Sequence, residues 1–350
     1  MVKSKIDNSE EANIPEGITR HTLETPRGLE CEVTNYGCRI MRMMVPDREG
    51  EFADIVLGFD TIEEYFKKPE NFFGSIVGRV ANRIRGAKFK LNGTPFDLPV
   101  NEEGTHIHGG PEGFHSKVWN VLAANESFIS FTYNSKDGEQ GYPGNLKLKV
   151  TYGLTDDHGL TIQYQATTDK ATPVNLSNHS YFNLRGAGNG DINDHVFKIN
   201  ASKYLPVDSD QIPLKEPATV KDTVFDLRKP QVVGELLKTD DDQLKIGKGF
   251  DHTMVTDKKG LRVVAEVLEP ESGRIMEVMT DEPGVQFFCG KAMEKKIKGK
   301  GGKTYGERSA FCLETQHFPD SVHRIGFPSV ILKPGEVYRS TCIYRFDVKI

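Results

Sequence analysis

Apolar and polar residues alternate in short runs along most of the chain. Residues 128–133 (FISFTY) alternate and end close to an Asp-Gly pair, and residues 146–152 (LKLKVTY) alternate strictly up to a glycine. A further run, residues 160–165 (LTIQYQ), follows an Asp-His-Gly turn. Side chains two residues apart share one face of a strand, so these runs predict half-buried strands. The tight turns between them predict antiparallel hairpins and meanders.

The last third of the chain repeats this pattern. A five-residue turn separates residues 261–268 (LRVVAEVL) from residues 274–280 (RIMEVMT), and residues 338–348 (YRSTCIYRFDV) alternate nearly to the end. We expect a strand, a turn and a second strand, followed by one long final strand.

Helical patterns are rare. Only residues 61–66 and 232–237 suggest helices, and both runs are short. No helix-length run recurs between the strands, which argues against β-α-β units, and no linker or repeat of about 20–50 residues divides the chain. We therefore expect a polar tail over residues 1–14 and a single all-β domain over residues 15–350, with antiparallel sheets packed face to face.

Composition narrows the class of protein. The 34 glycines and 18 prolines favour many tight turns over long helices. The chain has 45 Lys and Arg against 50 Asp and Glu, a net charge of −5. That balance argues against a nucleic-acid partner, because such proteins usually carry a strongly basic face. With 37% apolar residues, wholesale disorder is not expected either.

The sequence also gives expectations about the cellular setting. No apolar stretch approaches the roughly 18–20 residues that span a bilayer, and the polar N-terminus lacks the apolar core of a secretory signal. The five cysteines are widely spread and form no C-x-x-C pair. We expect reduced, mostly buried thiols in a cytoplasmic protein with no membrane partner, present as a monomer or weak homodimer.

A lysine-rich segment, residues 291–303 (KAMEKKIKGKGGK), carries six lysines and three glycines. Like charges and glycines predict a mobile, solvated loop. A phosphate-binding loop is the alternative, since Gly302-Lys303-Thr304 ends like one. The first glycine that this motif requires falls on Ile297, however, so the spacing fails.

His106 and His108 form an H-x-H pair beside two glycines. On a strand, alternation puts both rings on one face, which suits a metal ion, and with Glu112 the segment resembles half of a cupin motif. The upstream glycine of that motif is Val100 here, and no second histidine motif follows closely. Because too few ligands are in sight, we expect no metal and a His108 that faces a polar cleft.

Residues 175–183 (NLSNHSYFN) gather amide, hydroxyl, imidazole and aromatic side chains. A core strand rarely carries so many hydrogen-bonding groups, because each buried one must find a partner. Alternation predicts one face with Asn175, Ser177, His179 and Tyr181, where sugar hydroxyls could be hydrogen-bonded and C–H faces could stack on rings. A buried structural network is the alternative.

Three further segments contain polar or charged residues that are candidates for binding or catalysis. Asn82 and Arg83 offer donors suited to hydroxyls or carboxylates, with a structural ion pair as the alternative. Asp251 lies between an aromatic residue and a histidine after a glycine, and could also be an ordinary turn residue. Glu314 lies in an apolar run, where burial raises the pKa of a carboxyl. It is the best candidate for a catalytic base unless a buried Arg pairs with it.

This ordered set of segments resembles the aldose 1-epimerase (galactose mutarotase) family from about Gly17 to the C-terminus. The resemblance implies a β-supersandwich of antiparallel strands. It also implies interconversion of the α and β anomers of aldohexoses such as galactose and glucose, with no metal or organic cofactor. The matching segments are GRVANRI (78–84), HIHGG (106–110), GYPG (141–144), VNLSNHSYFNL (174–184), LPVD (205–208), FDLRKP (225–230), GFDH (249–252), PGVQFF (283–288) and LETQHFPDS (313–321).

By this resemblance, Glu314 is the general base and His179 the general acid. The sugar-binding residues that it implies are Asn82, Arg83, His108, Asp251 and Gln286. The chemistry fits these residue types, because anomerisation removes a proton from the C1 hydroxyl and delivers one to the ring oxygen. An ionised carboxylate can accept the first proton and an imidazole can donate the second.

One departure from the family pattern leaves the substrate open. After PGVQF the run is Phe288-Cys289-Gly290-Lys291, and the lysine-rich segment follows at once. A hexose-6-phosphate 1-epimerase and an enzyme for a non-sugar hemiacetal therefore remain alternatives. A sugar-binding module without catalysis would not need the acid and base, yet both residues are present.

Overall fold

The computed structural model describes residues 16–67, 72–214, 216–257, 259–289 and 296–349. The polar tail predicted for residues 1–14 lies outside the described residues. The architecture is all-β: antiparallel strands dominate, and the α-helices within the described ranges are three short ones.

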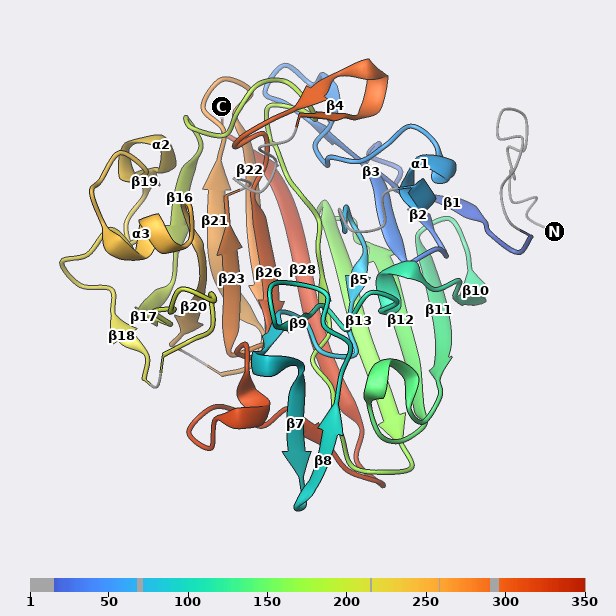
Figure 1. Ribbon diagram of the computed structural model, residues 1–350. Coiled ribbons are helices and arrows are strands. Elements are labelled where there is room, and N and C mark those ends of the chain that lie inside the picture. The colour runs from blue at the N-terminus through green and yellow to red at the C-terminus, as the bar shows by residue number, and fades with distance from the viewer. Residues whose placement is uncertain (1–15, 68–71, 215, 258, 290–295, 350) are drawn as a thin grey trace.

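The largest sheet has nine strands, and every neighbouring pair in it is antiparallel (Figure 1). In spatial order its strands are β10 (Asn120–Ala124), β11 (Phe128–Ser135), β12 (Leu146–Leu154), β13 (Gly159–Thr168), β28 (Tyr338–Val348), β22 (Arg274–Thr280), β21 (Arg262–Leu268), β16 (Val196–Ile199) and β19 (Gln231–Val232).

A five-stranded sheet contributes three of the predicted site residues, Asp251, Gln286 and Glu314. Its order is β18 (Ala218–Thr219), β17 (Ala201–Tyr204), β20 (Asp251–Thr256), β23 (Gly284–Phe288) and β26 (Cys312–Gln316). A four-stranded sheet follows chain order with β1 (Arg20–Glu24), β2 (Glu30–Thr34), β3 (Arg39–Pro46) and β4 (Phe52–Asp54).

Five two-stranded pairs complete the β-structure of the described residues. They are β5 (Ile76–Val77) with β15 (Ser177–Asn178), β6 (Arg83–Ile84) with β9 (His106–Ile107), β7 (Lys88–Leu91) with β8 (Thr94–Asp97), β14 (Thr172–Pro173) with β27 (Ile331–Leu332), and β24 (Ile297–Lys298) with β25 (Thr304–Tyr305).

The strands that alternation predicts are confirmed. All six predicted runs lie in β11, β12, β13, β21, β22 and β28, and the bounds of β22 and β28 agree with the sequence pattern. In β12, the even-numbered side chains from Leu146 to Leu154 are buried and the odd-numbered ones between them are not, as a half-buried strand requires. β23 and β26 instead bury nearly all their residues, because they lie inside the molecule.

The sheets pack face to face around one large apolar core that includes Phe182, Phe197, Phe287 and Phe311. The hydroxyl of Tyr344, on β28 of the nine-stranded sheet, reaches the carbonyl of Leu313 on β26 at 3.4 Å. The two sheets are therefore in direct contact. Replacing one of these buried aromatic side chains by Ala typically costs about 3–5 kcal/mol.

The helices agree with the sequence in part. α1 (Ile62–Lys67) and α2 (Val233–Leu236) lie within a residue or two of the predicted runs, but α3 (Asp242–Ile246) was not predicted. The carboxylate of Asp241 caps α3 by accepting hydrogen bonds from the backbone N–H groups of Gln243 and Leu244. None of the described helices is long and apolar enough to cross a membrane.

The prediction of a solvated lysine-rich segment holds for most of its described part, residues 296–303, because five of these eight residues are exposed, but they do not form an irregular loop. Here the chain forms the β24–β25 hairpin with a 3₁₀ turn at its tip. The ammonium of Lys300 is 2.6 Å from the carboxylate of Asp54 and 2.8 Å from the carbonyl of Val56. Lys303 binds the carbonyl of Ala187. Specific acceptors therefore anchor these lysines; residues 291–295 lie outside the described residues.

Candidate active site

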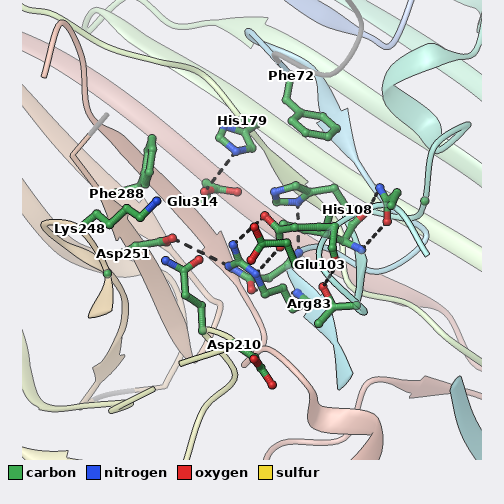
Figure 2. A pocket seen from close by; sticks show the side chains of 18 of the residues that line it. Phe72, Arg83, Glu103, His108, His179, Asp210, Lys248, Asp251, Phe288 and Glu314 are labelled. Carbon is green, nitrogen blue, oxygen red and sulfur yellow. Dashed lines mark hydrogen bonds and ion pairs between the residues drawn. The ribbon is translucent and has the colours of Figure 1, made fainter. Parts of the chain in front are cut away.

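A pocket of about 720 Å³ brings together the end of the five-stranded sheet and the loops around β6 and β9 (Figure 2). Its lining includes Asn82, Arg83, His108, Asp251 and Glu314, together with His179. Six of the seven predicted site residues, distant in sequence, therefore line one cavity. A volume of this size is typical of a small-molecule site.

Glu314 forms part of the buried floor of this pocket. Its side chain comes from the middle of β26, and the residue is 2% exposed. Burial raises the pKa of the Glu314 carboxyl well above its usual range, the nearby charge of Asp251 adds to this, and Arg83 opposes it. The Oε2 atom has no hydrogen-bond partner among the described residues. The alternative of a Glu neutralised by a direct Arg pair is not what the structure shows.

Arg83 instead pairs with Glu102, a residue that the sequence did not point out. The guanidinium holds both carboxylate oxygens, with Nε–Oε2 at 2.5 Å and Nη2–Oε1 at 3.0 Å. Its Nη1 lies 3.9 Å from Oδ2 of Asp251. The sequence allowed Arg83 to be either a structural ion-pair partner or a binding-site residue. The structure shows an Arg83 that is paired with a carboxylate and also lines the pocket.

Gln286 lies one layer behind the pocket, which it does not line. Its Nε2 donates to Oδ1 of Asp251 at 2.6 Å, and its Oε1 accepts from the hydroxyl of Thr253 at 2.5 Å. The sugar-binding role expected for Gln286 stays a prediction. Its Oε1 and one of its two Nε2 hydrogens are bonded, and the bond to Asp251 fixes the orientation of that carboxylate. Burial raises the pKa of that carboxyl, and Arg83 opposes the rise.

Asn82 and His108 are joined by two hydrogen bonds, one between their backbones and one from the backbone of Asn82 to the His108 ring. Both adopt the left-handed region, with φ of 61° and 52°. The N–H of His108 donates to the carbonyl of Asn82, and the N–H of Asn82 donates to Nδ1 of His108 at 3.2 Å. Since burial lowers the pKa of His108 well below its usual value, the ring is neutral and its proton is on Nε2. The left-handed backbone is a strain often found at functional sites.

The expectation that His106 and His108 share one face of a strand is wrong. β9 ends at Ile107, so the alternation stops before His108. His106 turns away, with Nδ1 2.8 Å from the carbonyl of Pro99 and Nε2 2.8 Å from the hydroxyl of Tyr142. Only His108 lines the pocket, as the sequence predicts for the cleft histidine.

The segment 175–183 fulfils both interpretations that its sequence allows. His179 and Tyr181 line the pocket. Asn175 exchanges two hydrogen bonds with the backbone of His317, and the hydroxyl of Ser177 donates to the carbonyl of Thr315. The first half of the segment is therefore a buried structural network that holds the chain against β26.

His179 is enclosed by aromatic rings. Tyr181 stacks on it with ring centroids 4.8 Å apart, Phe72 lies nearly parallel at 5.8 Å, and His108 meets it edge-on at 5.0 Å. Its Nε2 is 3.7 Å from Oε1 of Glu314. Burial lowers the pKa of His179 to about 3, so the imidazole is a strong acid whenever it carries a second proton.

Several lining residues were missed by the sequence analysis. Phe72 contacts His108, His115 and His179 with its ring, and it follows no motif that would have singled it out. Lys248 and Asp210 come from turns, where charged residues are common, so composition gave no signal.

The donor atoms of His108, His179 and Glu314 lie within 4.8 Å of one another. Ligands of a tetrahedral zinc ion, at about 2.0–2.1 Å from the metal, would be about 3.3 Å apart, so this set would have to contract. His108 is also in the wrong tautomer, because Nδ1 accepts from Asn82 and Nε2 keeps its proton. The arrangement fits proton transfer better than metal binding.

Known proteins resemble this chain over nearly its whole length. The aldose 1-epimerase family model matches residues 19–345. Galactose mutarotases from Rattus norvegicus and Homo sapiens are each 44% identical over 321 residues, covering 91% of this chain and 92% of theirs. The aldose 1-epimerase of Escherichia coli is 34% identical over 329 residues, covering 93% and 94% of the two chains.

Solved structures give the same result. The GalM/aldose epimerase homologue from C. elegans has a TM-score of 0.89 at 28% identity, covering 95% of this chain and 100% of that one. The galactose 1-epimerase from Lactobacillus acidophilus has a TM-score of 0.84 at 29% identity, covering 97% of each. The predicted β-supersandwich is thereby confirmed, and the chain belongs to the aldose 1-epimerase family of isomerases.

Proposed function

We propose that this isomerase interconverts the α and β anomers of aldohexoses, galactose and glucose among them, with Glu314 as the base and His179 as the acid. The observation that carries this proposal is the 3.7 Å separation of Glu314 Oε1 and His179 Nε2 in a buried pocket. The C1 hydroxyl and the ring oxygen of a pyranose are bonded to the same carbon. Two neighbouring groups can therefore serve both oxygens at once.

The reaction conserves one proton on the pair. The carboxylate of Glu314 removes the proton of the C1 hydroxyl while Nε2–H of His179 protonates the ring oxygen, and the C1–O bond of the ring breaks. The open-chain aldehyde rotates about C1–C2. His179 then takes the proton back from the hydroxyl, and ring closure on the other face returns a proton from Glu314 to the new C1 oxygen. Each transfer typically contributes about 10²–10⁴ in rate.

The pKa directions of the two groups suit these roles. The raised pKa of the Glu314 carboxyl makes its ionised form a strong base, and the lowered pKa of His179 makes its protonated form a strong acid. The competent enzyme holds a single proton between them. Adding a second proton at low pH or removing the last at high pH abolishes this state, so kcat/KM is expected to follow a bell-shaped pH profile.

The remaining pocket residues bind the hydroxyls of the sugar. Arg83 and Nε2–H of His108 provide donors, and the carboxylate of Asp251 provides an acceptor held in place from behind. Asn82 uses its Oδ1 to bind the backbone N–H of Arg83 and leaves its amide N–H₂ as a further donor. Such fixed groups keep the sugar oriented while its ring opens.

No observation favours a phosphorylated hexose. None of residues 296–303 lines the pocket, and Lys300 and Lys303 are bound elsewhere. The pocket lining contains Glu102, Glu103 and Asp210 beside Lys248, a balance that disfavours an anionic substrate.

The test is polarimetry of freshly dissolved α-galactose, α-glucose and α-glucose 6-phosphate, with Glu314→Gln as the blank. We expect both free sugars to equilibrate faster with the wild type than with the variant, and the phosphate to gain less. A larger gain for the phosphate would establish the hexose-6-phosphate alternative, and no gain for any sugar would leave the non-sugar hemiacetal as the substrate class.

We also infer a cytoplasmic protein that acts as a monomer or weak homodimer. All five cysteines are free and buried, which suits a reducing compartment. The proposed acid and base, His179 and Glu314, both belong to the same chain, so the proton transfers do not require a residue from a second copy. Light scattering across a tenfold dilution series tests the assembly; a stable higher oligomer would contradict it.

A further inference from the structure

The buried thiol of Cys312 lies against the edge of the catalytic imidazole. Its Sγ is 3.6 Å from Nδ1 of His179, and the residue is completely buried. Burial raises the pKa of the Cys312 thiol well above its usual value, so the sulfur carries its proton at neutral pH. The proposed mechanism uses neither the thiol nor Nδ1, and no sequence motif singled out this cysteine.

Cys312 and Glu314 each lie close to one of the two ring nitrogens of His179. They are two residues apart on β26 and therefore share a face of the strand. From that face, Cys312 reaches Nδ1 and Glu314 reaches Nε2. The rings of Tyr181 and Phe72 lie nearly parallel to the imidazole and restrain its tilt. Figure 2 shows Phe72, His179 and Glu314 around the pocket. Edges and faces of His179 are thus both constrained.

The contact allows the sulfur to accept a proton that the ring carries on Nδ1. A sulfur is a weak acceptor, and a donor–acceptor separation of 3.6 Å to sulfur is a hydrogen-bonding distance. A hydrogen bond to its own backbone also raises the pKa of His179, against the larger effect of burial. That effect is expected of a ring N–H that donates to a carbonyl, and Nδ1 is the nitrogen nearer the backbone. Both acceptors favour a proton on Nδ1.

We propose that Cys312 is a positioning residue whose sulfur accepts the Nδ1 proton of His179, leaving Nε2 as the only imidazole nitrogen that exchanges a proton with the sugar. This inference rests on the proposed role of His179 as the acid. When Nε2 protonates the ring oxygen, the imidazolium becomes the neutral Nδ1–H tautomer; when Nε2 takes the proton back, the imidazolium returns. The thiol keeps its own proton throughout.

A thiol suits this position better than a carboxylate. An Asp beside Nδ1 would stabilise the imidazolium and weaken it as an acid. A neutral sulfur orients the ring without adding charge. The neighbouring His108 has the opposite tautomer, since its Nδ1 accepts a hydrogen bond from a backbone N–H and its Nε2 carries the proton. The two histidines therefore play different roles toward the same sugar. His179 offers a lone pair or a mobile proton, and His108 offers a fixed donor.

The tautomer of His179 is measured by ¹⁵N NMR of protein labelled at histidine, at a pH where the ring is neutral, with His179→Gln used to assign its signals. We expect the wild type to show a protonated Nδ1 and an unprotonated Nε2. Cys312→Ala should mix the tautomers and lower kcat about five- to tenfold with KM within about twofold, the loss typical of one hydrogen bond. Cys312→Ser, which keeps an acceptor, should restore kcat to within about threefold of the wild type.

Cys31→Ala is the matched control, because Cys31 is an equally buried cysteine in the core, away from the pocket. It should change neither the tautomer nor kcat. A wild-type His179 with its proton on Nε2 would overturn the proposal, and this holds even if Cys312→Ala does not fold. The proposal also fails if Cys312→Ala keeps the wild-type tautomer and kcat, or if Cys31→Ala loses as much activity. An active His179→Gln would instead overturn the acid assignment itself.

Discussion

The two sides of the pocket satisfy their polar groups in opposite ways. On the binding side, Arg83 holds both oxygens of Glu102, and Asp251 is bonded by Gln286, which Thr253 bonds in turn. On the side of β26, Oε2 of Glu314 lacks a hydrogen-bond partner within the described chain, and the 3.7 Å gap between Glu314 and His179 is longer than a hydrogen bond.

This difference separates recognition from chemistry. Groups that bind hydroxyls must keep one orientation, so partners that lock them are useful. Groups that gain and lose a proton must tolerate both states, and a strong internal partner would favour one of them. The cost is an unpaired buried carboxyl, which destabilises the fold when it ionises. Substitutions on the chemical side should therefore lower activity without lowering stability, whereas substitutions on the binding side should lower both.

The largest effect is expected on the chemical side. His179→Gln should lower kcat by about 10²–10⁴, because the ring oxygen then has no positioned proton donor, while KM changes little. Anomer exchange measured by NMR saturation transfer gives both parameters. A variant that keeps more than about a tenth of the wild-type kcat would remove His179 from the acid role.

On the binding side, Arg83→Met should damage both function and fold. It leaves Glu102 and Asp251 without their cation, and Asp251 is largely buried. We expect KM to rise at least about tenfold and the free energy of unfolding to fall by about 3 kcal/mol, as when one partner of a buried pair is removed. Urea unfolding together with saturation kinetics checks this. Unchanged stability would mean that the pairing of Arg83 is not structural.

Gln286→Leu sharpens the assignment of Gln286 as a residue behind the pocket. Asp251 loses one fixed donor but remains beside Arg83. We expect kcat/KM to fall about tenfold, carried mostly by KM. Thr253→Ser, which keeps the hydroxyl that bonds Gln286, should retain activity within about twofold. A loss for Gln286→Leu as large as that for Arg83→Met would show direct contact with the sugar.

The smallest effect on catalysis is expected outside the pocket. Lys300→Met leaves the carboxylate of Asp54 without its closest cation, so the free energy of unfolding should fall by about 1–3 kcal/mol. The kinetic constants for free hexoses should stay within about threefold of the wild type. Thermal unfolding and polarimetry on the same samples decide between an anchoring lysine and a substrate-binding one.

Alternation along the chain was enough to predict six adjacent strands inside the nine-stranded sheet, from β11 to β21 in spatial order, because a half-buried strand must show it. The short pairs, such as β6 with β9, carry no such signal: two residues are too few for a period. The density of polar groups pointed to His179, and a lone carboxylate in an apolar run pointed to Glu314, since burying such groups without function would be costly.

The sequence could not show which polar residues bond to which others around the pocket. Gln286 and Asp251 are equally polar in the sequence, yet one is bonded behind the other. Likewise, His106 and His108 diverge because the backbone turns left-handed at His108, which no local pattern announces for a non-glycine residue. The anchoring of the lysine-rich segment could not be predicted for a related reason, as its acceptors, Asp54 and Ala187, are distant in sequence.

The central claim, that Glu314 is left unpaired for chemistry at a cost in stability, is tested most directly by comparing Glu314→Gln with the wild type. Because the folded-state pKa of Glu314 is raised, the protonated form stabilises the fold below the unfolded value of about 4.5, and this contribution is lost as pH rises through the folded pKa.

Glu314→Gln should therefore lose kcat by at least about 10²-fold and yet have a Tm equal to that of the wild type near pH 4 and roughly 2 °C or more above it at pH 8. Differential scanning calorimetry at the two pH values, on samples also assayed for mutarotation, gives the answer. A variant that is inactive and less stable than the wild type at pH 8 would contradict the account, because Glu314 would then be a structural carboxylate.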